Sequence, residues 1–144
     1  MEDSSLKLSE QICFPIYASS RLITRLYQPL LNKIGLTYPQ YLVMMVLWEH
    51  GEQKVTEIGN RIFLNTNTLT PLISKLIAKG LITKDRSNED ERTVFITLTS
   101  SGIKLKESAE CIPYELAKNM NMSADELLQL KNTMWKILKQ LDNQ

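Results

Sequence analysis

The chain changes its hydrophobic period at Gly80, and this change limits the folds open to it. Before the glycine, apolar residues recur at the i, i+3, i+4, i+7 spacing of one helix face: Leu69, Leu72, Ile73, Leu76 and Ile77. After it, residues 81–84 and 93–98 have the character of strands, and the charged segment 85–92 separates them. The pattern therefore predicts a helix that ends at a C′ glycine and is followed at once by a β-hairpin.

Two helical patterns open the chain. Apolar residues at helical spacing run from Leu6 to Ile34, interrupted by Pro15 and Pro29, and Gly35 is expected to end that helix. Residues 37–40 (Thr-Tyr-Pro-Gln) form a capping box that predicts an apolar helix through about Trp48.

Further helices are predicted on both sides of the hairpin. A short helix over 55–63 is followed by one over 65–79, which must begin within about one turn before Pro71 because proline has no N–H. Residues 102–119 and 123–141 are predicted helices, the last opened by a second capping box.

This order of elements is that of a winged helix-turn-helix, in which one helix enters the major groove of DNA and the hairpin reaches the neighbouring minor groove or backbone. We predict a mainly α fold with a small β-hairpin, a single domain over 1–144 with the winged helix-turn-helix at about 37–100. Residues 1–36 and 101–144 are predicted to be dimerisation helices of a homodimer, because they carry more apolar residues than a lone winged domain needs.

The predicted 65–79 helix has a face suited to DNA. Asn can pair with an adenine edge, Thr can pack its methyl group on thymine, and Ser or Thr can bind phosphate. No Asp or Glu occurs between Ile58 and Lys84, whereas Arg61, Lys75, Lys79 and Lys84 are basic. The alternative is a solvated polar helix of any α domain, and the hairpin that follows favours DNA. The predicted DNA-binding residues of this helix are Asn65, Thr66, Asn67, Thr68, Thr70, Ser74 and Lys75.

The hairpin tip carries both signs of charge. Arg86 and Arg92 would be attracted to phosphates, whereas the acidic run 89–91 would be repelled. In one arrangement Asp90 pairs with Arg92 and orients its guanidinium into a narrow minor groove, so that Arg86, Asp90 and Arg92 all belong to the DNA site. In the other, the tip is only a solvated, salt-bridged turn, and the spacing favours neither.

Composition excludes several classes of protein. The chain has 144 residues, 43% of them hydrophobic, and a net charge of +1, which is the balance of one ordinary globular unit. The polar N-terminus lacks a signal-peptide core and the longest apolar run, 41–48, is too short for a membrane span, so we expect a cytoplasmic protein without a membrane partner. Its single histidine, His50, and the absence of a Cys-x-x-Cys pair argue against a zinc site, and no cofactor is expected.

Several stretches together resemble the MarR family of dimeric regulators, and within it the organic hydroperoxide resistance repressors. The most specific of them is the Leu-Thr-Tyr-Pro-Gln-Tyr block with a cysteine upstream, and the similarity covers nearly the whole chain. The shared stretches are residues 11–14, 17–21, 36–42, 47–49, 68–72 and 90–92.

The resemblance implies a peroxide switch on an inverted-repeat operator in double-stranded DNA. The cysteine matching Cys13 is the redox-sensing residue, which organic hydroperoxides oxidise before the repressor leaves its operator. Tyrosines matching Tyr27 and Tyr38, from the other subunit, hydrogen-bond its thiolate, and Tyr17 lies close by. Phenol O–H donors favour a thiolate over a thiol, which is what a reactive cysteine requires.

Two departures from the family pattern stand out. Asn-Thr-Asn occupies residues 65–67, where the family has Asp, a small residue and Gly, so base preference is expected to differ. Pro15 follows Cys13 by two residues, and it is expected either to break the helix or to be its N1 residue with Cys13 just outside the positive end of the dipole.

The second thiol is Cys111. Some family members carry a resolving cysteine, but its position corresponds to about Lys118, so the resemblance implies a one-cysteine mechanism. In that mechanism Cys13 becomes a sulfenic acid and then a mixed disulfide with a small thiol. We expect Cys111 to be a buried apolar residue.

Two other functions are compatible with parts of the sequence. The same DNA-binding fold could respond to a small aromatic ligand in the dimer cleft, as other MarR-like proteins do. A thiol peroxidase using Cys13 is the third hypothesis, and it lacks a recognisable resolving pair and a thioredoxin-like βαβ pattern.

Overall fold

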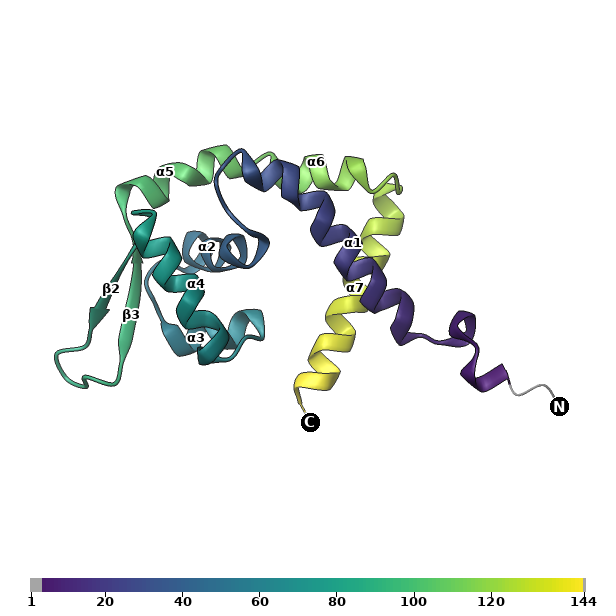
Figure 1. Ribbon diagram of the computed structural model, residues 1–144, viewed down its shortest axis with the longest axis horizontal. Helices are drawn as coiled ribbons and strands as arrows, with labels where there is room; N and C mark the ends of the chain where they lie inside the picture. Colours follow the sequence, from purple (N-terminus) through teal and green to yellow (C-terminus); the bar gives the residue numbers. More distant parts are fainter. Residues whose placement is uncertain (1–3, 144) are drawn as a thin grey trace. The chain divides into compact units, whose positions relative to one another are not determined.

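A computed structural model describes residues 4–143, which fall into two compact units, one ending at Glu110 and the other beginning at Cys111. The first unit contains the helices and the sheet of the predicted winged helix-turn-helix (Figure 1). No helix among the described residues is long and apolar enough to cross a membrane.

The first long helix, α1 (Cys13–Asn32), is shorter than its apolar pattern predicted. Two short 3-10 turns, Ser4–Leu6 and Leu8–Glu10, precede it. Pro29 lies inside α1 and does not end it. The helix ends as predicted at Gly35, which has a φ of 70°. The Gly35 N–H donates to the Asn32 carbonyl at 3.2 Å and the next N–H donates to the Leu31 carbonyl at 3.1 Å, which is the Schellman pattern.

The predicted capping box is present and opens α2 (Tyr38–His50). The Gln40 N–H donates to the Thr37 hydroxyl at 3.4 Å, and the Gln40 side chain accepts from the Thr37 N–H at 3.1 Å. Six of the 13 residues of α2 are buried, with Val43 and Met44 fully inaccessible. This helix is therefore the centre of the first unit, and other elements pack around it.

The helix-turn-helix consists of α3 (Val55–Ile62) and α4 (Thr66–Ala78), close to the predicted bounds. Phe63 links them in the left-handed region at a φ of 57°. The apolar stripe of α4 faces the core as predicted, with Leu69, Ile73 and Leu76 buried. Gly80, at a φ of 72°, ends the helix and turns the chain into the hairpin.

The hairpin belongs to a three-stranded antiparallel sheet of order β1-β3-β2. Its strands β2 (Ile82–Arg86) and β3 (Val94–Leu98) pair from Ile82 opposite Leu98 to Arg86 opposite Val94, and they project away from the helices (Figure 1). The tip is therefore shorter than predicted, because residues 85 and 86 lie in the strand. The two-residue strand β1 (Gln53–Lys54) was not predicted.

The prediction of one continuous helix over 102–119 is wrong, because the structure has two helices there. The first, α5 (Ser100–Ala109), begins earlier at a Thr99 cap, and the second unit starts with α6 (Ile112–Asn119). Pro113 explains the break: it has no N–H to donate to the preceding turn, so it is tolerated only in the first turn of a new helix. The second unit ends with α7 (Ala124–Asp142), whose predicted Ser123–Glu126 capping box is present.

Candidate nucleic-acid interface and redox site

The exposed face of α4 is where the predicted DNA-binding residues lie. Asn65 is the N-cap, and its Oδ1 accepts from the Thr68 N–H at 2.9 Å. The Thr70 hydroxyl donates to the Thr66 carbonyl at 2.8 Å, so this hydroxyl is already paired within the helix. The predicted residues on this helix are all exposed: Asn65, Thr66, Asn67, Thr68, Thr70, Ser74 and Lys75.

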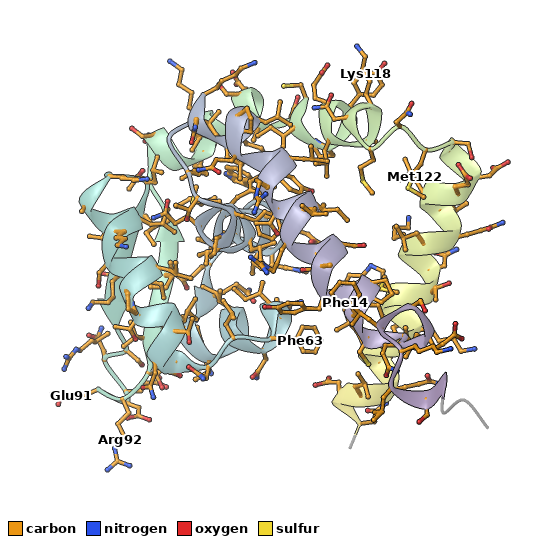
Figure 2. The ribbon with its side chains drawn as sticks, turned by 45° about the vertical axis from the view of Figure 1, so that its right-hand side comes forward. Phe14, Phe63, Glu91, Arg92, Lys118 and Met122 are labelled. Carbon is orange, nitrogen blue, oxygen red and sulfur yellow. The ribbon has the colours of Figure 1, made fainter. Side chains whose placement is uncertain are left out.

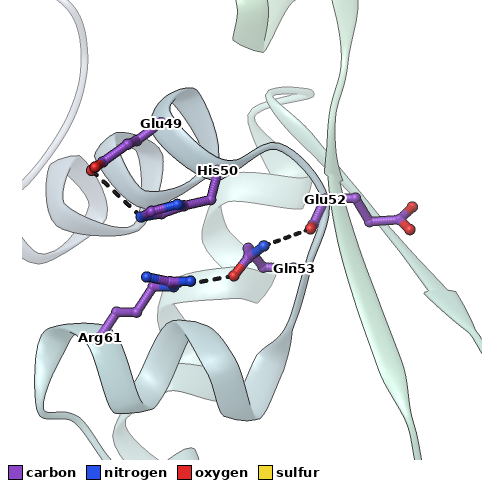
Figure 3. Close-up of polar contacts among 5 residues, drawn as sticks. All are labelled: Glu49, His50, Glu52, Gln53 and Arg61. Atoms are coloured by element: carbon purple, nitrogen blue, oxygen red, sulfur yellow. Dashed lines mark hydrogen bonds and ion pairs between the residues drawn. The ribbon is translucent and has the colours of Figure 1, made fainter.

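The four basic residues of the acid-free stretch have different roles in the structure. Arg61 donates through Nε to Gln53 Oε1 at 3.2 Å, which links α3 to β1, and Gln53 in turn donates to the Glu52 carbonyl (Figure 3). Lys79 donates through Nζ to Gln40 Oε1 at 3.0 Å and to the Gly35 carbonyl, so its charge serves an internal contact. The side chains of Lys75 and Lys84 are exposed and make no hydrogen bond within residues 4–143, which leaves both ammonium groups available to phosphate.

A second polar contact lies beside the first (Figure 3). The His50 ring and the Glu49 carboxylate are 3.5 Å apart at the end of α2, on the protein surface. No group of three metal-ligating side chains occurs among the described residues.

The wing tip differs from the first of the two arrangements considered for it, in which Asp90 orients the Arg92 guanidinium. Asp90 Oδ1 accepts from the backbone N–H of Arg92 at 2.9 Å, a hydrogen bond that closes the turn instead of orienting the guanidinium. The side chains of Glu91 and Arg92 point away from the hairpin (Figure 2). Arg86 and Arg92 are both exposed, so Asp90 shapes the loop from which Arg92 extends.

The predicted redox residue is the first residue of α1. Cys13 is exposed, and Pro15 is the third helical residue. The expectation that Pro15 would break the helix or be its N1 residue is therefore wrong. The first four N–H groups of a helix have no partner within it, so a proline is tolerated there. The Cys13 thiol thus lies within the first turn of α1, at the positive end of its dipole.

Two of the three predicted tyrosines, Tyr27 and Tyr38, form an aromatic cluster with Tyr41 between α1 and α2. The rings of Tyr27 and Tyr38 are 4.8 Å apart, and each lies beside Tyr41, whose ring is 6.3 Å from that of Trp48. Burial raises the pKa of Tyr27, the neighbouring phenols of Tyr38 and Tyr41 raise it further, and burial also raises the pKa of Tyr38. Both phenols therefore remain hydrogen-bond donors at neutral and mildly alkaline pH.

These tyrosines lie far from the cysteine of their own chain. Fourteen helical positions separate Cys13 from Tyr27 on the continuous helix α1, which corresponds to about 21 Å. Tyr17, one turn from Cys13, is 63% exposed, and the Arg21 guanidinium lies 5.6 Å from its ring centroid. Tyr27 and Tyr38 are thus brought together, and Cys13 can reach them only from a second copy of the chain.

The expectation that Cys111 is buried is wrong. It is exposed at the N-cap of α6, because the turn before Pro113 places it outside regular helix. Lys118, the position of the family's resolving cysteine, is exposed near the end of the same helix (Figure 2).

A pocket of about 370 Å³ was missed by the sequence analysis. Arg21 and Arg25 of α1 line it together with Thr37 and Tyr38 at the start of α2. One sequence signal could have revealed its charge: no Asp or Glu occurs between Gln11 and Trp48.

The exposed, polar α4 together with the projecting hairpin defines the class of this protein, a winged helix-turn-helix DNA-binding protein. Comparisons place it more narrowly. Residues 25–109 match the family model described as transcriptional regulator SarA/Rot. The organic hydroperoxide resistance transcriptional regulator of Bacillus subtilis (strain 168) is 45% identical over 136 residues, which cover 94% of this chain and 92% of the relative.

Solved structures agree with this placement. Reduced AbfR bound to DNA is 33% identical at a TM-score of 0.82, covering 98% of this chain and 99% of that one; AbfR is from Staphylococcus epidermidis. Overoxidised AbfR bound to DNA is 34% identical at a TM-score of 0.79, with 98% of both chains covered. A MarR variant from E. coli complexed with operator DNA shares the fold, at 21% identity and a TM-score of 0.76 over 85% of this chain and 90% of that one.

The chain belongs to the MarR family of transcriptional regulators, and its relatives include organic hydroperoxide resistance regulators. It is a DNA-binding regulator of transcription and not an enzyme.

Proposed function

We propose that this regulator is a homodimeric repressor which releases its operator when an organic hydroperoxide oxidises Cys13. The observation that carries this proposal is the pairing of Tyr27 and Tyr38 at 4.8 Å, two phenols held protonated by burial. Two such donors are suited to hold a thiolate. The Cys13 of the same chain lies about 21 Å from Tyr27 along α1, so the thiolate that the two phenols hold is that of the second subunit.

Apolar surface on the terminal helices supports the dimer. None of the 19 residues of α7 is buried, yet the helix carries Leu128, Trp135 and Leu141, each at least half exposed. On α1, Phe14 and Leu22 are 45% and 57% exposed. Exposed large apolar side chains on terminal helices are typical of an interface, and a two-fold copy is the simplest partner. Sedimentation at micromolar concentration is expected to show a dimer, and a stable folded monomer would contradict it.

The DNA partner is an inverted-repeat duplex. The side chains of α4 from Asn65 to Lys75 face the major groove, and Arg86 and Arg92 of the wing contact the backbone or the adjacent minor groove. Two-fold symmetry places the half-sites about one helical turn apart. A regulator of this kind acts where its operator is, so we place it in the cytoplasm.

The chemistry of the switch needs an oxidant and a small thiol. The Cys13 thiolate attacks one peroxide oxygen, the S–O bond forms as the O–O bond breaks, and the departing alkoxide takes a proton to leave as an alcohol. Cys13 is then a sulfenic acid, which a small thiol converts to a mixed disulfide with release of water. The added group overpacks the dimer interface, at a cost of about 1–3 kcal/mol. Rotation of the two DNA-binding lobes relieves this strain, and a cost of that size is enough to change operator affinity about tenfold.

Titration of operator DNA with matched variants tests this function. The parent protein is expected to lose operator affinity after treatment with cumene hydroperoxide and a small thiol. Cys13→Ser is expected to bind as well as the parent and to ignore the oxidant, whereas Cys111→Ser is expected to bind and still respond. Normal release of Cys13→Ser by the hydroperoxide would overturn the assignment.

We propose a ligand-responsive regulator as the second candidate, because the pocket beside Tyr38 favours it. Two guanidinium groups, from Arg21 and Arg25, and the Thr37 hydroxyl line a space of about 370 Å³, which suits a small aromatic acid. Under this alternative, salicylate would weaken operator binding of Cys13→Ser and parent equally, and Arg25→Gln would abolish the effect.

A further inference from the structure

Lys79 makes an internal contact that neither DNA binding nor peroxide chemistry explains. It caps the C-terminal end of α4, where its own N–H donates to the Lys75 carbonyl at 3.1 Å. Its ammonium group reaches back to the corner between α1 and α2, which we define as residues 35–40. There it donates to the Gly35 carbonyl and to Gln40 Oε1, at 3.0 Å for the latter.

The acceptors in this corner are structural atoms. Gly35 is the left-handed residue that ends α1, and Gln40 is the residue that completes the capping box of α2. Gln40 is only 2% exposed, and its Oε1 accepts from both the Thr37 N–H and the Lys79 ammonium. Both lone pairs of that oxygen are therefore used, and the bond from the charged donor is the stronger of the two.

The same corner carries the sensor tyrosine of the proposed function. Tyr38 is the first residue of α2, between the Thr37 cap and Gln40, and its ring packs on Tyr27. A displacement of Tyr38 moves the capping box to which Lys79 is bonded. Because α4 is one 13-residue helix of about 20 Å, a shift at its C-terminal end is carried to the N-terminal turn that faces DNA.

We propose that Lys79 is a positioning residue that couples the oxidation state of Cys13 to operator binding, by tying the recognition helix α4 to the corner that carries Tyr38. This inference rests on the proposed function. Apolar packing of Leu69, Ile73 and Leu76 keeps α4 in the fold, whereas the polar tie fixes where its end lies relative to the sensor. Removal of the ammonium should therefore loosen the coupling and leave folding and DNA recognition intact.

The test compares the operator Kd of the reduced and the oxidised protein. Lys79→Met keeps the aliphatic stem and loses the donors, so the ratio of oxidised to reduced Kd, about 10 in the parent, is expected to fall by about 2- to 10-fold. The rate at which Cys13 gains mass on oxidation should be unchanged. Lys79→Arg, whose guanidinium can donate to the same oxygens, is expected to restore the parent ratio.

Lys33→Met is the matched control. Lys33 is exposed, two residues before Gly35, and makes no hydrogen bond to α4 among the described residues, so its loss removes the same charge from the same region. Its Kd ratio is expected to equal that of the parent. If Lys79→Met melts below the assay temperature, Lys79→Gln, which is too short to reach both oxygens, replaces it.

The possible outcomes distinguish a failure of the proposed function from a failure of the role proposed for Lys79. A parent that keeps its operator affinity after oxidation overturns the proposed function, and this inference with it. A parent that responds, together with a Lys79→Met protein that responds by the same factor, overturns the inference alone. An equal fall of the ratio in Lys33→Met would also overturn it, because charge and not the tie would then be responsible.

Discussion

Two asparagines at the start of α4 allow the stability of the recognition helix to be tested separately from its DNA binding. Asn65 is the N-cap, and its Oδ1 accepts from the Thr68 N–H at 2.9 Å. Asn67, two residues later, is exposed, and its side chain makes no hydrogen bond within residues 4–143. The same substitution, Asn→Ala, therefore removes a cap at one position and only a surface amide at the other.

The expected changes in stability have different sizes. Loss of an Asn cap costs about 1 kcal/mol, within a range of about 0.5–2, so Asn65→Ala should lower the melting temperature by about 3–5 °C. Asn67→Ala should leave it unchanged or raise it slightly, because alanine is the better helix former. Asn65→Asp keeps an acceptor at the cap and should melt with the parent. All proteins are compared at one concentration, since dimerisation affects the melting temperature.

Asn67→Ala, which should leave stability unchanged, is expected to weaken operator binding. A side-chain amide that reads a base contributes about 1–3 kcal/mol, so Asn67→Ala is expected to bind the operator about 5- to 150-fold more weakly. Fluorescence anisotropy with labelled duplex measures this, with a scrambled duplex as the reference for non-specific binding. The reasoning is refuted if Asn67→Ala binds like the parent, or if it is destabilised as much as Asn65→Ala.

Three further predictions concern the wing, the tyrosine cluster and the packing of α5. Arg86→Ala and Arg92→Ala should each weaken operator binding and lower the salt slope by roughly one unit per phosphate, and unchanged binding across a salt series would exclude a wing contact. The raised pKa of Tyr27 means that its phenol holds the proton more tightly in the folded state than in the unfolded state. The stability that this group contributes is complete below a pH of about 10 and falls as the pH rises further. Tyr27→Phe should therefore lose stability less steeply than the parent at alkaline pH. Gly102→Ala would place a Cβ 2.1 Å from the Leu81 carbonyl oxygen and should cost about 1–3 kcal/mol in thermal melts, whereas the neighbouring exposed Ser101→Ala should cost less than about 0.5.

Strong periodicity and capping made much of the fold predictable. The α4 stripe, the glycines at 35 and 80 and both capping boxes were confirmed, because each depends on interactions between residues close in sequence. The strand β1 could not be found in this way, since two residues carry no period and its pairing partner lies more than forty positions away. Pro113 could have predicted the break between α5 and α6, but the apolar residues on both sides of it have the spacing of one continuous helix.

The site was predictable in its residues more than in its contacts. Every α4 side chain proposed for DNA is exposed, because the polar face follows from the apolar one. The hydrogen bond from the Arg92 N–H to Asp90 depends on the backbone of a turn, which charge spacing does not specify. The tie between Lys79 and the corner at Gly35 joins residues 44 positions apart, and no local rule predicts it.

The central claim is that oxidation of one cysteine switches operator binding. Anisotropy of labelled operator and the intact mass of the protein can be followed in the same hydroperoxide time course. We predict that release follows modification of Cys13, reaches completion at one modified thiol per subunit, and precedes any modification of Cys111. Complete release while Cys13 is still a thiol, or full modification of Cys13 with the operator still bound, would contradict the account.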